Sequence, residues 1–134
     1  MKIIEIIKNK TVLARLIPAD SWKEGLSFFS KDSEYIQVGT WKYEKGKELL
    51  AHIHSKVERK INRTQEVLLI RKGKIKASIY DLKGKIVKSL VVNEGDILVL
   101  LNCGHGYKIL ENNTQVIEIK NGPYLGAKID RRRI

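Results

Sequence analysis

The stretch EVLLIRKGKIKASIYDLKGKIVKSLVVNEGDILVLL, residues 66–101, decides the fold of this chain. Polar and apolar residues alternate over 74–80, and runs rich in Val, Ile and Leu fill 66–70, 86–92 and 97–101. Alternation with a period of two is typical of a strand with one buried face. Turn-forming residues (Gly, Asn and Asp) separate these runs, so the stretch predicts successive antiparallel hairpins.

The rest of the chain follows the same pattern. Runs at 2–7 and 11–17 predict an N-terminal hairpin, and runs at 107–110 and 114–120 predict a last one. Further strands are expected at 35–43 and 49–54, and only 19–25 is expected to form a helical turn. Many short strands with regular turns predict an all-β barrel or jelly roll.

The length of 134 residues predicts a single domain, with an N-terminal extension over 1–34, a barrel core over 35–120 and a basic tail over 125–134. No apolar run approaches the roughly 20 residues of a membrane span, and the N-terminus lacks a signal-peptide pattern. The one cysteine, Cys103, fits a reducing compartment. We therefore expect a cytoplasmic protein with no membrane contact.

The formal net charge of +11 raises the question of an anionic partner. Lysines are spread over the whole chain, and only Arg131–Arg133 forms a compact basic run, which can equally be a solvated tail. No basic helix or aromatic RNA-binding motif accompanies it, which disfavours nucleic acid as a partner. A small anionic substrate, or solubility alone, accounts for the charge at least as well.

The three histidines lie where a barrel could hold a metal ion. His52 and His54 belong to an apolar run, and residues two apart in a strand point to the same face. His105 follows a second apolar run, and Glu66 opens a third. Three imidazoles and one carboxylate suit one divalent first-row metal ion with open positions for water or substrate.

The spacing around these residues resembles the two motifs of the cupin family of small jelly-roll barrels. The first motif corresponds to Gly46, five residues, His52-Ile53-His54, a gap, Glu66, six residues and Gly73; the second corresponds to Gly95-Asp96 leading to His105. The resemblance covers about residues 40–120. It implies a cupin-type jelly-roll β-barrel, here with an N-terminal β-hairpin extension, and one Fe, Mn, Ni or Zn ion held by His52, His54, Glu66 and His105.

Two features depart from the family pattern. Eleven residues separate His54 from Glu66 where the family has three or four, and the proline of the second motif is missing. Glu58 falls at the shorter spacing, but the six-residue step to Gly73 follows Glu66, which favours Glu66 as the ligand. The phrases Arg63–Val67 and Gly104–Gly106 resemble a bacterial and archaeal subset associated with polysaccharide and nucleotide-sugar gene neighbourhoods.

Other side chains could complete a substrate site. Arg59 and Arg63 could hold a carboxylate or phosphate by bidentate contacts, or be solvated loop charges. Tyr107 could touch substrate or line the barrel wall. Cys103 could be a ligand or nucleophile, although a lone cysteine is more often a small apolar filler.

The residues and the resemblance together lead to one main hypothesis with rivals. The main one is a metal-binding cupin that isomerises, epimerises or oxygenates a small anionic or sugar-derived substrate. A non-catalytic binding or sensing module, or a structural partner in a larger assembly, stays open because fold does not determine function. The edge of the N-terminal hairpin predicts a homodimer.

Overall fold

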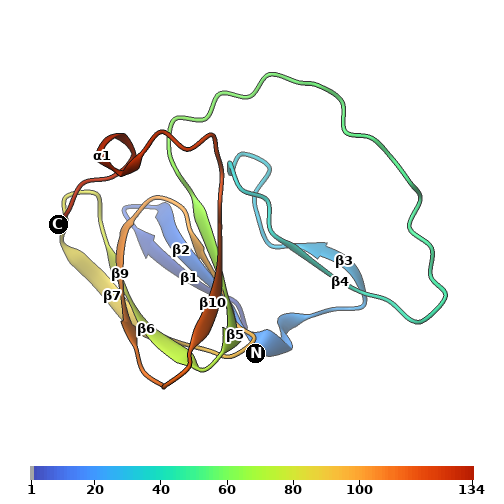
Figure 1. Ribbon diagram of the computed structural model, residues 1–134, viewed down its shortest axis with the longest axis horizontal. Helices are drawn as coiled ribbons and strands as arrows, with labels where there is room; N and C mark the ends of the chain where they lie inside the picture. Colours follow the sequence, from blue (N-terminus) through green and yellow to red (C-terminus); the bar gives the residue numbers. More distant parts are fainter. Residues whose placement is uncertain (1) are drawn as a thin grey trace.

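The computed structural model describes residues 2–134, which form mainly antiparallel β-structure (Figure 1). The strands are β1 (Ile4–Lys8), β2 (Thr11–Ile17), β3 (Gly25–Phe28), β4 (Gly39–Lys42), β5 (Glu66–Lys72), β6 (Lys74–Tyr80), β7 (Ile86–Asn93), β8 (Ile97–Leu100), β9 (Gly104–Ile109) and β10 (Gln115–Lys120). A 3-10 turn at Ala19–Ser21 and the short helix α1 (Ala127–Asp130) complete the described elements. The expected all-β class is confirmed, and no sheet within 2–134 closes on itself.

The larger sheet has five strands in the order β1-β2-β8-β5-β10, and every pair in it is antiparallel. Its central strand β8 is an apolar run buried at every position, as expected for a strand covered on both faces. β2 pairs with β8 in the register Ala14↔Leu100 to Ile17↔Ile97. The N-terminal hairpin is therefore an integral part of the main sheet.

A three-stranded sheet, in the order β7-β6-β9, packs on one face of the larger sheet. The alternation predicted for 74–80 decides this packing, because Ile75, Ala77 and Ile79 share one face of β6 and are buried. They meet Leu68 and Ile70 of β5 in the main hydrophobic cluster. Burying each large aliphatic side chain stabilises the sandwich by about 1.5–3 kcal/mol.

The other face of the five-stranded sheet is covered by the residues that precede β4. Phe29, Ile36 and Val38 pack on a second cluster that includes Val67 and Val99. The hairpin of β3 and β4 extends beyond this cover, to the side of the sandwich (Figure 1). Strand β3 was not expected from the sequence, and the strand expected over 35–43 is confined to β4.

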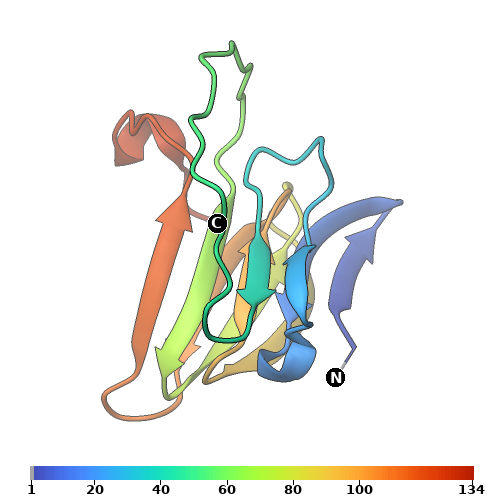
Figure 2. The same cartoon turned by 90° about the vertical axis from the view of Figure 1, so that its right-hand side faces the viewer.

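Residues 43–62 form an extended segment, here named the arm, that arcs away from both sheets (Figures 1 and 2). The prediction of a strand over 49–54 is therefore wrong for this chain taken alone. Its apolar alternation has no surface to cover, since Leu50 is 88% and Ile53 is 94% exposed. A strand needs a hydrogen-bonded neighbour, and the structure pairs none with this run. No helix in residues 2–134 is both long and apolar enough to span a membrane.

Candidate functional site

Glu66 and His105 meet at one side of the sandwich, between the two sheets. Glu66 opens β5 on the face that also carries Leu68 and Ile70, so its carboxylate points between the sheets. His105 on β9 lies opposite Ile79 of β6 and shares its inward face. The His105 Nε2 atom lies 3.2 Å from Glu66 Oε2, and the two side chains are 30% and 12% exposed. The pair therefore sits at the boundary between the core and solvent.

Tyr107 extends the site along β9. Its ring stacks on His105, with centroids 5.2 Å apart and planes inclined by 29°. Partial burial, and to a lesser degree the charge of Glu66, raises the pKa of Tyr107, so its phenol keeps its proton at neutral pH. A protonated phenol next to an imidazole is a hydrogen-bond donor for a bound ligand.

Cys103 lies two residues before His105 and packs against the main hydrophobic cluster. Burial raises the pKa of its thiol to about 12, and the nearby carboxylate of Glu66 adds to the shift. The thiolate is the form that attacks electrophiles and binds metals, and it is scarce at such a pKa. This agrees with the interpretation of Cys103 as an apolar filler.

The far side of the carboxylate is occupied by a lysine from β10. Lys120 is in register with Glu66, and its Nζ atom lies 3.6 Å from Glu66 Oε1 and 2.8 Å from Glu118 Oε1. The hydrogen bond to Glu118 is the main cause that raises the pKa of Lys120. Glu66 is thus held between an imidazole on one side and an ammonium group on the other.

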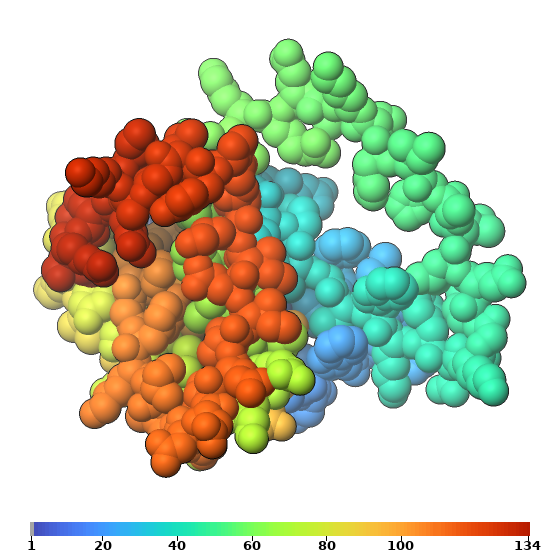
Figure 3. All heavy atoms as spheres, viewed as in Figure 1, coloured from blue at the N-terminus to red at the C-terminus, as the bar shows by residue number. Residues whose placement is uncertain are grey.

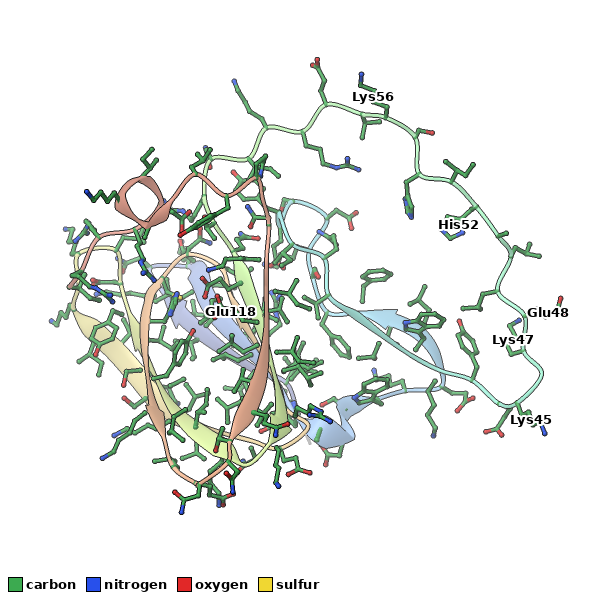
Figure 4. The ribbon with its side chains drawn as sticks, viewed as in Figure 1. Lys45, Lys47, Glu48, His52, Lys56 and Glu118 are labelled. Carbon is green, nitrogen blue, oxygen red and sulfur yellow. The ribbon has the colours of Figure 1, made fainter. Side chains whose placement is uncertain are left out.

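His52 lies elsewhere, on the exposed arm (Figure 4), and His54 follows it there. Their rings are close to each other, with centroids 4.9 Å apart, although the two residues do not lie in a strand. The space-filling view shows the arm standing clear of the sandwich along much of its length (Figure 3). In residues 2–134 no group of three or more His, Cys, Asp or Glu side chains is close enough to hold a metal ion. The structure therefore brings the four predicted ligands together as two separate pairs.

The two pairs also separate the alternative carboxylates. Glu58 lies exposed on the arm, as the histidines do, whereas Glu66 touches His105. Imidazole nitrogen and carboxylate oxygen are the donors that first-row divalent ions use in proteins. Each pair thus supplies suitable donors, and together they match a four-ligand set.

The predicted anion-binding arginines lie toward the foot of the arm. Arg63 lines a cavity of about 240 Å³ together with Asn62, Gln65 and Asn102, and its charge partly offsets the rise in the pKa of Cys103. Arg63 therefore acts electrostatically on Cys103. Arg59 lines a different cavity, of about 440 Å³, beside Tyr35 and Gln37.

An amide network that the sequence did not reveal anchors the foot of the arm. The backbone N–H of Gln65 donates to Asn121 Oδ1 at 2.7 Å, and Asn121 Nδ2 donates to the Arg63 carbonyl at 3.3 Å. The Oε1 atom of Gln65 accepts from the N–H groups of Tyr35 and Ile36. The one signal in the sequence is a polar residue next to Glu66 at the start of an apolar strand; Gln65 is buried there.

No protein-family model matches this chain, and no curated protein or solved structure is similar enough to count as a match. The fold and site define an antiparallel β-sandwich that carries a carboxylate–imidazole pair on its open side. The cupin resemblance accordingly rests on the motif residues Gly46–Gly73 and Gly95–His105 themselves.

Proposed function

We propose that this protein is a cupin-type jelly roll that binds a divalent first-row metal ion and acts on a small anionic or sugar-derived molecule. The pair of Glu66 and His105 carries this proposal. Glu66 points inward next to Leu68 and Ile70, and His105 points inward opposite Ile79, where polar groups are costly unless they are paired. A few polar groups that converge beside an apolar surface are typical of a ligand-binding site.

Glu66, His105, His52 and His54 would hold the metal ion, with the arm supplying the last two. The arm is extended and carries its two histidines side by side, which is the arrangement that two ligands from one strand require. An arm laid along the open side of the sandwich also supplies the segment that would complete the jelly roll. A bound ion at this place would polarise a carbonyl or enediolate, or with iron activate dioxygen.

The chain's own residues favour an anionic ligand. Lys120 lies beside Glu66, Arg63 acts electrostatically on the neighbouring Cys103, and the arm adds Lys56, Arg59 and Lys60. The guanidinium of Arg63 can pair with a carboxylate or phosphate in a bidentate manner. Tyr107, kept protonated by its raised pKa, can donate a hydrogen bond to a ligand oxygen at His105. These groups would bind and orient a sugar phosphate, a nucleotide sugar or a small carboxylate.

A second function, ligand binding without turnover, has an observation of its own in favour. The carboxylate of Glu66 already faces both His105 and Lys120, so it is not a free general base. Tyr107 and Cys103 both have raised pKa values and stay protonated at neutral pH. A barrel with these groups can retain a ligand and yet lack a base that would transform it.

Metal analysis of the purified protein tests the proposal. We expect about one iron, manganese, nickel or zinc ion per chain after dialysis, lost in His105→Ala and in His52→Ala. Lys108→Ala is the matched control, because Lys108 lies on β9 with its side chain on the opposite face to His105. Absence of metal even after anaerobic reconstitution would refute the metal site. Turnover of sugar phosphates or carboxylates by the loaded protein, against saturable binding alone, separates the two functions.

A further inference from the structure

The arm carries apolar side chains on both of its faces with nothing to cover them. Its exposed large apolar residues are Leu49, Leu50, Ile53, Val57 and Ile61. Leu50 and Ile53 are separated by an odd number of positions, so in an extended chain they point in opposite directions. Removing these apolar side chains from water would lower the free energy on both faces of the segment. Contiguous exposed apolar surface marks an interaction site in a soluble protein.

The sandwich lacks a strand at the same time. β9 pairs with β6 along one edge, and its other edge has no strand partner in residues 2–134. Tyr107 and Ile109 share the inward register of the buried Ala77 and Ile75, yet they remain 40% and 58% exposed. Opposite them, all six residues of β10 are exposed. An open edge with uncovered apolar residues is a template for an added strand.

The alternation of the arm fits this edge in one antiparallel register. In an extended chain Leu50, His52 and His54 share one face, and the proximity of the two imidazole rings agrees with that. An antiparallel strand with its histidines beside His105 places Leu50 toward Ile109. The same placement brings the two imidazoles to the pair of Glu66 and His105.

We propose that the arm of one chain adds as a strand to β9 of a second copy, so that the metal centre is shared between two chains. His52 and His54 of one copy would complete the site formed by Glu66 and His105 of the other, and reciprocal exchange builds two such sites. This inference rests on the proposed function for the ion, whereas the exchange of arms stands on the exposed surfaces alone. Exchange of an identical segment closes with two-fold symmetry.

The surface at the root of the arm favours a second copy over the chain's own arm. Leu26, Phe28 and Trp41 share one face of the β3–β4 hairpin, and all three are exposed. Tyr43, the first residue of the arm, meets the Trp41 ring edge to face. An arm folded back onto its own β9 leaves this aromatic face bare, whereas contact with a second copy would also cover it. The arm and hairpin together reach the roughly 20–30 residues a side of a specific protein interface.

Two inactive variants in one dimer test the shared site. The first variant is His52→Ala/His54→Ala, with an intact centre; the second is His105→Ala, with an intact arm. Each is expected to bind no zinc alone. Co-expressed with two different affinity tags and purified through both, the mixed pair is expected to bind one zinc ion, against two for a wild-type pair. A mixed pair without zinc, beside a wild-type protein that binds it, would overturn the shared site.

Cross-linking tests the exchange of arms without any metal. On a Cys103→Ala background, Ile53→Cys and Lys108→Cys both lie on outward positions of the proposed pairing. Treatment with a short bismaleimide should give a species of twice the chain mass under denaturing conditions. Ile53→Cys/Lys88→Cys is the matched control and should stay uncross-linked, because Lys88 lies on β7 at the opposite edge of that sheet. A cross-link within one chain, or a monomer by light scattering, would overturn the exchange even if the metal site exists.

Discussion

The guanidinium of Arg15 forms a bidentate ion pair with the carboxylate of Glu34, with Nη1 at 3.0 Å from Oε2 and Nη2 at 2.9 Å from Oε1. Arg15 is a buried residue of β2, and its Nε atom also donates to Glu5 at 3.0 Å. The hydrogen bond to Glu34 is the main cause that raises the pKa of Arg15, so the pair stays charged throughout the ordinary pH range. This contact fastens residues 29–38, and with them the β3–β4 hairpin, to the five-stranded sheet.

Removing Glu34 should destabilise the protein strongly. Glu34→Ala leaves a buried guanidinium with one remaining carboxylate, and we expect the free energy of unfolding to fall by about 3 kcal/mol. Glu5→Ala is the control: that carboxylate is more exposed, and its loss should reduce the free energy of unfolding by less than about 1 kcal/mol. Urea unfolding followed by circular dichroism measures both, and equal effects would contradict the assignment.

The free energy of unfolding should depend on the ionisation of Asp81, which lies in the turn between β6 and β7. Asp81 accepts hydrogen bonds from Lys8 Nζ and from the N–H groups of Lys83 and Lys85, and these lower its pKa to about 2. A pKa lowered on folding adds stability above the unfolded value of about 3.9, and this is lost as the pH falls through about 2. Asp81→Asn should therefore be less stable than wild type at pH 7, with the difference shrinking toward pH 2. Glu58→Gln, on the exposed arm, should track wild type throughout; an Asp81→Asn deficit that persists unchanged at pH 2 would speak against the Lys8 contact.

The thiol of Cys103 should report on the charge of Glu66. Burial and the nearby carboxylate raise its pKa to about 12, so we expect slow alkylation by iodoacetamide at pH 8. Glu66→Gln removes the negative charge and should lower that pKa, which increases the alkylation rate at a given pH. Unfolded protein in urea gives the rate of a free thiol for comparison. A native rate as fast as the unfolded one would contradict the buried position.

Lys120 should weaken the binding of a divalent cation. Its ammonium group lies near Glu66 Oε1 and competes electrostatically with a positive ion at that carboxylate. Lys120→Ala should therefore tighten zinc binding by about threefold to tenfold, as expected for one partly screened charge at this distance. Lys120→Arg keeps the charge and should bind as wild type does in a titration with a zinc-sensitive dye. Weaker binding in Lys120→Ala would show that the lysine supports the site by other means.

Much of the sandwich could be predicted because its strands are defined locally. The alternation over 74–80 and the apolar run at 97–101 correspond closely to β6 and β8, and the predicted N-terminal hairpin is β1 and β2. In each case the distribution of apolar residues along the strand indicates which faces are buried. Short turns then determine which strands become antiparallel neighbours. The cupin resemblance implied that Glu66 and His105 lie close together, and their side chains are in contact.

The remaining features depend on partners that are distant in sequence. The run at 49–54 has the alternation of a strand, but a strand forms only where another edge meets it. The sequence did not indicate that Glu118 and Lys120 lie near Glu66. Their position on the inward face follows only from the register of β10 with β5. Asn121 was missed for a similar reason, since its hydrogen bonds join it to residues more than 50 positions away.

The amide network at Gln65 gives a physical account of the unusual eleven-residue gap between His54 and Glu66. It fixes the downstream end of the arm, while the β3–β4 hairpin fixes the upstream end. The entropic cost of closing a loop grows with the logarithm of its length. Each doubling of the length therefore adds only about 0.6 kcal/mol to the free energy. The residues between His54 and Arg63 therefore act as a long flexible connection. A long flexible connection allows the two histidines to lie far from the carboxylate of Glu66. Insertions between His54 and Arg63 should therefore be tolerated, whereas insertions in β5 should not.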